Sequence, residues 1–238
     1  MKLIIDIGNT IIKIALFDNK RMLRVADLNV LSDINIRDFL SEDIVSKGIL
    51  SSVKEIDDQA IKIIKKYNLL LLDENTLIPI KSHYKNPRTL GKDRIAAAVS
   101  AHLSYPSKNI LILDLGTCLT IDYVNQAGEY EGGRISPGLK MRYKALHEFT
   151  DKLPLAKIKT QSPFFGDDTN SSINSGVQRG MIAEIDAVID AFMKEKEDSC
   201  VIFTGGDCFF FEKELKNQIF ANPFLVLEGL KEILDYNG

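Results

Sequence analysis

The feature that most constrains this chain is a hairpin of buried strands with an acidic turn, which the sequence contains twice. Near the N-terminus, KLIIDIGNTIIKIALF places Asp6 and Gly8 between two apolar runs, and ILILDLGTCLTIDY places Asp114 and Gly116 in the same way. The apolar residues are continuous rather than alternating, which is typical of strands covered on both faces of a sheet. The two copies lie roughly half a chain length apart, so they indicate the duplication of a large unit rather than a solenoid repeat.

Each turn carries groups that can bind a phosphate chain and its metal. Gly116 lets the backbone approach a ligand closely, Thr117 offers a hydroxyl and an N–H, and Asp114 is an acid at the end of a strand. A single copy is equally well explained by an Asp that only hydrogen-bonds within its turn. Because the motif occurs twice, we expect two similar half-molecules with a cleft between their acidic turns.

Length and composition agree with two domains. A chain of 238 residues is long enough for two domains of about 110 residues, and we predict domains at 1–108 and 109–238. The apolar fraction of 45 % provides a core for each of them.

Charge and the N-terminal residues bear on partners and location. The net charge of −3 and the pI of about 5.7 indicate no basic surface for nucleic acid or an anionic membrane. Asp6 breaks the first apolar run, which argues against a signal peptide, and no apolar stretch approaches ~20 residues. We therefore expect a cytoplasmic protein. The three cysteines lack CxxC spacing and the three histidines are scattered, which predicts neither a disulfide framework nor a zinc site.

Periodicity predicts the order β-β-β-α-β-α-β for the first part of the chain. After the first hairpin, the predicted elements are a strand near 24–30, a helix around 36–40, a strand at 47–53, a helix at 57–67 and a strand at 69–72. Asp93 and Arg94 then precede an alanine-rich run that stops before Pro106, which predicts a helix beginning at Asp93. An Asp at such a place is also an ordinary N-cap.

The second half contains a glycine-rich segment and a second glycine turn. The glycines at 128–140 indicate either backbone placed against a ligand or a second subunit, or a plain surface loop. The predicted elements after it are a helix at 141–149, a long amphipathic helix at 171–196 and a strand at 200–203. The last strand leads into TGGD, where Gly205 and Gly206 are suited to the sugar or phosphate of a nucleotide, although many Gly-Gly turns have no such role.

Four motifs in a fixed order, DIGNT, GKDR, DLGTCLT and GGRISPG, with TGGD after them, resemble those of type III pantothenate kinases. These kinases belong to the superfamily of actin, sugar kinases and Hsp70 ATPases. The resemblance runs from Asp6 to Asp207. It implies an α/β fold of two duplicated ribonuclease-H-like domains with a nucleotide cleft between them, a homodimer, and phosphorylation of pantothenate by ATP, the first step of coenzyme A biosynthesis.

The resemblance also implies roles for individual residues. The ATP and phosphate set corresponds to Asp6, Gly8, Asn9, Thr10, Lys13, Gly116, Thr117, Gly205 and Gly206. The pantothenate set corresponds to Tyr84, Gly91, Asp93, Arg94 and Thr169, with Thr169 contributed across the dimer. Asp6 and Asp114 correspond to ligands of Mg²⁺, and a monovalent cation, K⁺ or NH₄⁺, is implied without named ligands. Two positions depart from the family pattern, Cys118 in place of alanine and Asp168 in place of asparagine.

Phosphoryl transfer depends on positioning and charge neutralisation more than on covalent chemistry. Asp93 is therefore expected to act as the base for the pantothenate hydroxyl, and Arg94 supplies a permanent positive charge for an anionic substrate. Two other classes share these turns: an actin-like structural or regulatory ATPase, and a sugar or acetate kinase.

Overall fold

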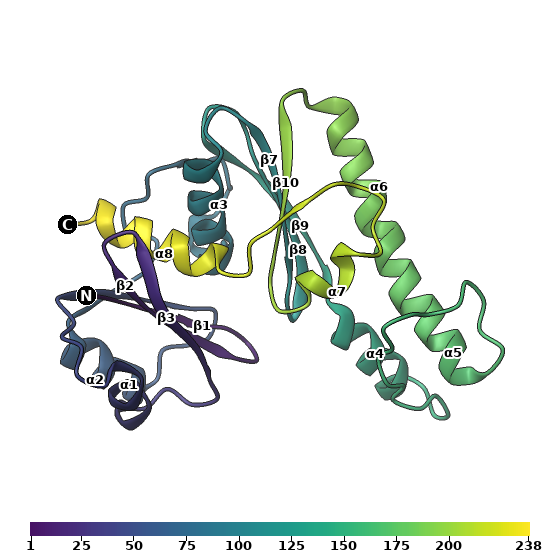
Figure 1. Cartoon of the computed structure of the whole chain (residues 1–238), viewed down its shortest axis with the longest axis horizontal. Coiled ribbons are helices and arrows are strands. Elements are labelled where there is room, and N and C mark those ends of the chain that lie inside the picture. Colours follow the sequence, from purple (N-terminus) through teal and green to yellow (C-terminus); the bar gives the residue numbers. More distant parts are fainter. The chain divides into compact units, whose positions relative to one another are not determined.

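The structure, a computed structural model, describes all residues from Met1 to Gly238 and consists of two compact units (Figure 1). Unit 1 contains Met1–Pro106, Gly128–Glu131 and Phe224–Gly238, and unit 2 contains Ser107–Ala127 and Gly132–Pro223. The C-terminal stretch thus returns to unit 1. The division into domains at 1–108 and 109–238 stays a prediction.

Unit 1 is built on a five-stranded sheet with the order β3-β2-β1-β4-β5. The first three strands form an antiparallel meander, and β4 and β5 add in parallel. In chain order the elements are β1 (Lys2–Ile7), β2 (Ile12–Asp18), β3 (Arg21–Leu28), α1 (Asp33–Leu40), β4 (Lys47–Ser52), α2 (Asp58–Tyr67) and β5 (Leu69–Leu71). The predicted order β-β-β-α-β-α-β is confirmed.

Both faces of this sheet are covered, which explains the continuous apolar runs. Leu3, Ile5 and Ile7 of β1 lie in one core with Ile36 of α1 and Ile63 of α2. Because side chains alternate along a strand, the residues between them point to the opposite face. There α8 (Leu225–Tyr236) contacts β1, β2 and β4.

Helix α3 (Lys92–Ser104) packs closely against α8 within unit 1 (Figure 1). A Cβ atom added to Gly229 of α8 would lie 1.8 Å from the carbonyl oxygen of Ala96. Only glycine permits this approach, and the alanines of α3 keep its own surface small. Sequence analysis did not predict α8.

The second sheet has the order β11-β10-β7-β8-β9-β6. Strands β7 and β8 are antiparallel, and β10 is parallel to both β7 and β11. The strands are β6 (Lys81–Ser82), β7 (Asn109–Leu115), β8 (Cys118–Val124), β9 (Glu129–Pro137), β10 (Ser199–Thr204) and β11 (Phe220–Ala221). The order β9-β8-β7-β10-β11 repeats β3-β2-β1-β4-β5, so the predicted duplication is confirmed in the topology.

A plain surface loop at 128–140, one of the two alternatives from the sequence, is wrong, because β9 and the start of α4 (Leu139–Glu148) occupy this segment. The two glycines within β9, Gly132 and Gly133, disfavour a strand by propensity, but pairing in the sheet overrides that preference. Tyr130 is fully buried and fixes the strand in the core, and Gly132 adopts a φ of 130°, which other residues rarely take.

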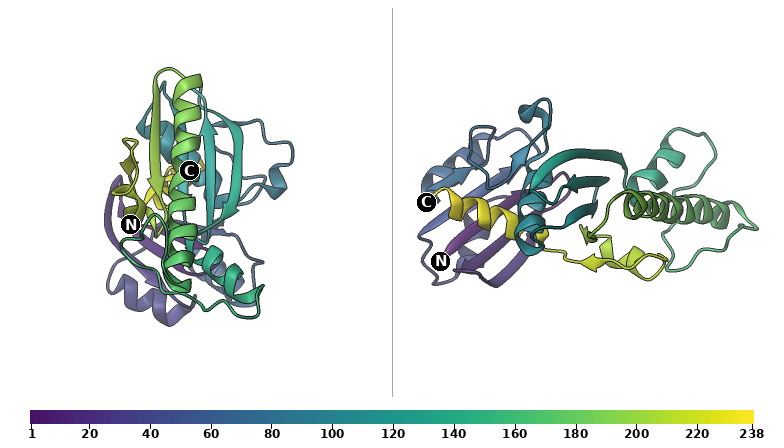
Figure 2. Two further views of the ribbon diagram at one scale, coloured as in Figure 1. Left: turned by 90° about the vertical axis from the view of Figure 1, so that its right-hand side faces the viewer. Right: turned by 90° about the horizontal axis from the view of Figure 1, so that it is seen from above.

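The long helix predicted at 171–196 is present as three consecutive segments: α5 (Thr169–Asn174), the π-helical turn η2 (Ser175–Arg179) and α6 (Gly180–Glu195). Its apolar stripe packs on the sheet of its own unit, as Met181, Ile185 and Ile189 lie in one core with Leu111 and Val201 (Figure 2). The stripe therefore contributes to the core of its own unit.

Two short helices complete the chain, the 3₁₀ turn η1 (Pro87–Thr89) in unit 1 and α7 (Cys208–Glu212) in unit 2. None of the helices combines the length and the apolar character that a membrane span requires.

Candidate active site

The first acidic turn connects β1 to β2 in unit 1. The N–H of Gly8 donates to the carbonyl of Ile11 at 3.1 Å, and a Cβ atom at Gly8 would lie 2.9 Å from that oxygen. Asn9 and Thr10 are exposed at the tip. The turn is thus tight, and its tip is open to a ligand.

Asp6 stands at the end of β1, paired in register with Lys13 on one side and with Ser51 on the other. Its Oδ1 is buried and has no hydrogen-bond partner. Burial and then the charge of Asp93 raise the pKa of Asp6 to about 7, while Ser51 and Lys13 lower it. A buried carboxylate in this state is poised to accept a cation.

Asp93 lies in the first turn of α3, but it is not the N-cap. The helix begins at Lys92 with Gly91 as the N-cap residue, and Oδ1 of Asp93 accepts a hydrogen bond from the N–H of Arg94 at 2.8 Å. A Cβ atom at Gly91 would lie 2.5 Å from this Oδ1, so glycine makes room for the carboxylate. Burial raises the pKa of Asp93, although the N–H and the charge of Arg94 oppose this.

Arg94 and Tyr84 lie beside this carboxylate in unit 1. Arg94 is only 6 % exposed, and its guanidinium carbon is 5.9 Å from the centre of the Tyr84 ring, a cation–π contact. The Tyr84 ring in turn lies 6.1 Å from the ring of Tyr130. Unit 1 therefore brings together Tyr84, Gly91, Asp93 and Arg94, the four residues that sequence analysis assigned to the substrate besides Thr169.

The second acidic turn lies in unit 2 and repeats the register of the first. Asp114 pairs with Thr120 across the hairpin and with Thr204 on β10, as Asp6 pairs with Lys13 and Ser51. The N–H of Gly116 donates to the carbonyl of Cys118 at 3.0 Å and closes the turn.

Two further glycines approach the second turn. Gly205 has a φ of 88°, and a Cβ atom there would lie 2.4 Å from Oδ1 of Asp114. At Gly138 a Cβ atom would lie 2.4 Å from the carbonyl oxygen of Gly116. The N–H of Asp207 donates to the carbonyl of Leu115 at 2.9 Å, so the TGGD segment is hydrogen-bonded to the second turn. Gly206, next to Asp207 in the chain, is exposed. Side chains at Gly138 or Gly205 would displace the turn.

Thr169 is the one predicted substrate residue in unit 2. It is exposed at the start of α5, where Oδ1 of Asp168 accepts a hydrogen bond from the N–H of Ser171 at 2.7 Å and caps the helix. Thr169 lines a cavity of about 530 Å³ together with Leu146 and Ile173. Asp168 therefore serves as the N-cap of α5, and aspartate caps a helix as well as the asparagine that the resemblance implies at this position.

Some residues of the site were not predicted. Ser51 was noted only as a polar residue at a strand end, and Gly138 only as part of a glycine-rich segment. Ser51 lies beside Asp6 because of the register of β4 on β1, and Gly138 meets the second turn because the chain folds back onto it after β9. The linear sequence does not show either feature.

Comparison with known proteins identifies the family. A profile described as type III pantothenate kinase matches residues 2–191. The chain is 44 % identical over 241 residues to a type III pantothenate kinase of Bacteroides fragilis, with 100 % of this chain and 99 % of the relative covered. This chain belongs to the type III pantothenate kinase family.

Solved structures agree on the fold of this family member. A Campylobacter jejuni protein described as a conserved Baf family transcriptional activator is 25 % identical, with a TM-score of 0.67 over 99 % of this chain and 98 % of that one. A glucokinase from Streptomyces griseus is 12 % identical, with a TM-score of 0.52 over 99 % of both chains. The latter likeness concerns the fold alone, and the predicted fold class, the two-domain actin-like fold, is confirmed.

Proposed function

We propose that this protein transfers the terminal phosphoryl group of ATP to pantothenate and so makes 4′-phosphopantothenate for coenzyme A biosynthesis. The observation that carries the proposal is Asp93, a half-buried carboxylate with a raised pKa beside Arg94 and Tyr84. It occupies the GKDR motif of a chain that is 44 % identical over its full length to a pantothenate kinase.

Asp93 is the base in this proposal. Its Oδ1 is engaged by the N–H of Arg94, so Oδ2 is the oxygen that takes the proton from the primary hydroxyl of pantothenate. A raised pKa makes this carboxylate a stronger base than an ordinary aspartate, and the matching of pKa to task is typical of general bases.

Arg94 and Tyr84 bind the acceptor. Pantothenate is a carboxylate anion at neutral pH, and the guanidinium of Arg94 keeps its charge even when buried. The Tyr84 ring is held between Arg94 and Tyr130, and we assign it to the apolar part of pantothenate. Gly91 acts through Asp93 because it leaves space for the carboxylate.

The two turns bind the phosphates of ATP. In the first, the assigned residues are Gly8, Asn9, Thr10 and Lys13, and in the second they are Gly116 and Thr117, with Gly205 and Gly206 beside the second turn. Glycines admit the phosphates to the backbone N–H groups, and hydroxyls and the Lys13 ammonium supply further donors. Positioning of this kind is the main requirement of phosphoryl transfer.

A divalent metal belongs to this chemistry, and the residues fit it. Oδ1 of Asp6 is buried without a hydrogen-bond partner, and its pKa of about 7 leaves it ionised or ready to lose its proton when a cation binds. We assign Asp6 and Asp114 to Mg²⁺, which prefers one or two carboxylates and water. When bound, Mg²⁺ neutralises charge on the phosphates. We also propose K⁺ or NH₄⁺ as an activating cation, on the resemblance alone.

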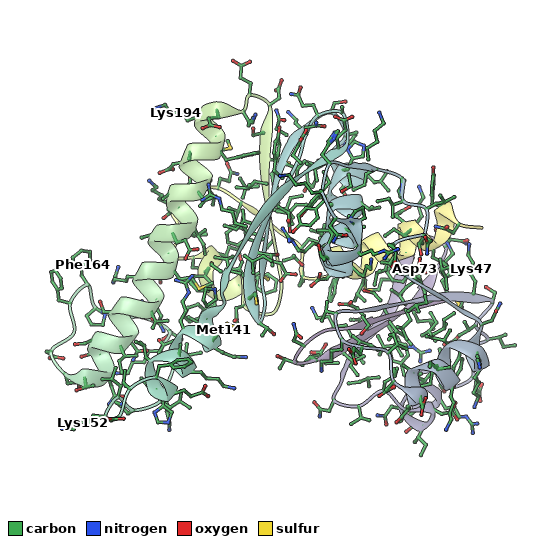
Figure 3. The ribbon with its side chains drawn as sticks, turned by 180° about the vertical axis from the view of Figure 1, so that it is seen from behind. Lys47, Asp73, Met141, Lys152, Phe164 and Lys194 are labelled. Carbon is green, nitrogen blue, oxygen red and sulfur yellow. The ribbon has the colours of Figure 1, made fainter.

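We further propose a homodimer in which Thr169 contributes to the partner's pantothenate pocket. The proposal is supported by exposed phenylalanines that precede α5 in the chain: Phe149, Phe164 and Phe165 are 86 %, 70 % and 83 % exposed. Phe164 is labelled in Figure 3. Exposed aromatic side chains of this size are enriched at protein interfaces. A cytoplasmic location is proposed because the reaction consumes ATP and feeds coenzyme A synthesis.

The test is release of ADP from ATP in the presence of Mg²⁺ and K⁺ with pantothenate, hexoses or acetate as acceptor. We expect ADP release that depends on pantothenate and is absent with the other acceptors. Activity with a hexose or acetate would assign the chain to the sugar and acetate kinases. Hydrolysis that needs no acceptor would favour an actin-like ATPase.

A further inference from the structure

An edge of the second sheet brings together a histidine and two glutamates that the proposed reaction does not use. Strand β6 pairs in parallel with β9, with Lys81 opposite Glu129, and the N–H of His83 continues the ladder by donating to the carbonyl of Tyr130 at 2.9 Å. Side chains alternate along a strand, so Glu129 and Glu131 share one face of β9 and His83 shares it from the neighbouring strand. Tyr130 points the other way and is fully buried.

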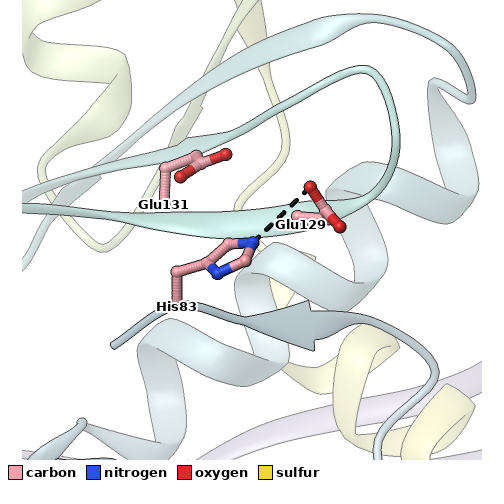
Figure 4. Close-up of side chains that lie close together, drawn as sticks. All are labelled: His83, Glu129 and Glu131. Atoms are coloured by element: carbon pink, nitrogen blue, oxygen red, sulfur yellow. Dashed lines mark ion pairs between the residues drawn. The ribbon is translucent and has the colours of Figure 1, made fainter. Parts of the chain in front are cut away.

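The donor atoms of these three residues are close enough to share one ion. Nε2 of His83 lies 3.5 Å from a carboxylate oxygen of Glu129 (Figure 4). One donor atom from each of His83, Glu129 and Glu131 can be chosen so that all three lie within 4.8 Å of one another. His83 and Glu131 are exposed and Glu129 is half-buried, so an ion can reach the site from solvent.

The donor set suits a divalent transition metal. Zn²⁺ binds imidazole nitrogen and carboxylate oxygen at about 2.0–2.2 Å, which in a tetrahedral site places two donors roughly 3.4 Å apart. The pair of His83 and Glu129 already has this spacing, and the exposed Glu131 side chain needs to move by no more than about 1.4 Å to reach it. The two carboxylates also offset the charge of a divalent ion. The ion would compete for Glu129 with the ammonium of Lys81, which lies 3.6 Å from a carboxylate oxygen of Glu129.

We propose that His83, Glu129 and Glu131 form a binding site for a divalent transition-metal ion such as Zn²⁺, with water in the fourth position. The linear sequence hides this site, because its histidines are scattered and only the register of β6 on β9 places His83 beside the glutamates. The backbone beneath the site is held by the β6–β9 ladder and by the buried Tyr130, so the donors project from a fixed frame.

An ion here would also act on the acceptor site, a consequence that rests on the proposed function. His83 is followed directly by Tyr84, whose ring contacts Tyr130 and Arg94. A metal ion shared by His83 and the glutamates of β9 would hold His83, the residue before Tyr84, in a fixed position. This restricts the orientations that the Tyr84 ring can adopt. Bound metal is therefore expected to change the KM for pantothenate more than kcat.

The test is isothermal titration of the protein with Zn²⁺ alone, without ATP or pantothenate. We expect saturable binding to the unaltered chain, weakened by more than roughly tenfold in His83→Gln and in Glu131→Gln, because even the loss of an outer-shell partner of a metal site typically costs that much. The control is His147→Gln, an exposed histidine of α4, which should bind as the unaltered chain does. Melting temperatures in chelator check that each variant is folded.

Two further readouts make the result decisive. The chain has three histidines, so ring NMR signals can be assigned to each, and Zn²⁺ should shift those of His83 and leave His102 and His147 in place. Bound Co²⁺ should show no charge-transfer band from thiolate, although three free cysteines are present. Absence of binding, equal binding in all variants, or a thiolate band would overturn the proposal. Because no substrate is used, failure of the kinase assignment would leave this outcome unchanged.

Discussion

Two carboxylates in unit 1 have environments that differ from those of ordinary surface aspartates. Asp6 and Asp93 both have raised pKa values, each mainly because of burial, and the charge of Asp93 adds to the shift of Asp6. A buried acid whose proton affinity is raised further by a neighbouring acid is costly to a fold unless a cation or a proton relieves it. This cost is the physical reason to regard them as functional.

Replacement of Asp93 by Asn distinguishes a catalytic role of this residue from a role in stabilising α3. Asp93 is not the N-cap of α3, and Asn can still accept the N–H of Arg94, so the melting temperature should change little. The base is lost, and turnover should fall by roughly 10²–10⁴-fold, or about 3–5 kcal/mol of barrier. Steady-state kinetics and thermal melting measure the two effects, and near-normal turnover would leave Asp93 without a catalytic role.

Replacement of Asp6 by Asn should stabilise the protein in the absence of metal and nucleotide. The folded pKa of about 7 exceeds the ordinary value of 3.8 for an aspartate, so the native state binds the extra proton and the free energy of unfolding falls as pH rises between these values. Above the folded pKa the full cost, about 4 kcal/mol, is present.

The pH dependence makes this prediction specific. Asn does not titrate, so the stability gain of Asp6→Asn over the unaltered chain should grow by about 3 kcal/mol from about pH 5 to about pH 8. Urea unfolding in chelator measures it, and activity should be lost because the metal ligand is gone. A gain that is independent of pH would contradict the assigned environment of Asp6.

The three acids of the candidate site could be predicted from sequence motifs, because each motif spans only a few consecutive residues. Asp6, Asp93 and Asp114 each lie two residues from a glycine, in a short turn or at a helix start. There the residue types and their spacing in the sequence are enough to indicate a functional acid. Ser51 and the His83 site could not be found in this way. Both depend on which residue of one strand faces which residue of another, and the sequence does not state that register.

The packing of α3 against α8 fixes the helix that carries Asp93. A Cβ atom at Gly229 would meet the Ala96 backbone at 1.8 Å, and a backbone atom cannot move aside as a side chain can. Gly229→Ala should therefore lower the free energy of unfolding by about 1–3 kcal/mol, despite the better helix propensity of alanine. Chemical denaturation measures the loss.

The matched control is Tyr236→Ala at the end of the same helix. Its side chain is 56 % exposed, and surface substitutions of that kind usually change the free energy of unfolding by no more than about 0.5 kcal/mol. If Gly229→Ala were as stable as the unaltered chain, the close approach of α3 and α8 would be disproved.

Elements with clear periodicity were predicted well, and the exceptions have physical causes. The order of unit 1 and the long helix of unit 2 follow from apolar spacing. Strand β9 was not predicted because its glycines disfavour a strand, whereas the sheet supplies the pairing that stabilises it. Helix α8 was not predicted, although its Leu225, Leu227, Leu230, Ile233 and Leu234 are buried.

The duplication is visible in the molecule as two sheets with one strand order. In each unit the first strand has an aspartate as its penultimate residue, its hairpin partner lies opposite, and a parallel strand lies on its other side. The repeat spacing of the acidic turns predicted two similar half-molecules, but not the order of their strands. The return of the C-terminal helix to unit 1 was not predictable, because no local signal marks it.

The proposed homodimer makes a prediction about mass and activity together. The unaltered chain should sediment as a dimer at assay concentrations, and Phe164→Ser with Phe165→Ser should shift it toward monomer and reduce activity. The control is Ile34→Ser, an exposed apolar residue of unit 1 at 70 % exposure, which should change neither. A fully active monomer would exclude a role for Thr169 across an interface.

The most direct test of the central claim is mass spectrometry of pantothenate after incubation with the protein, ATP, Mg²⁺ and K⁺. The account predicts a product heavier than pantothenate by one phosphoryl group, formed by the unaltered chain and reduced by roughly 10²–10⁴-fold with Asp93→Asn. Pantothenate that remains unphosphorylated by the folded, unaltered protein would contradict the assignment of this chain as a pantothenate kinase.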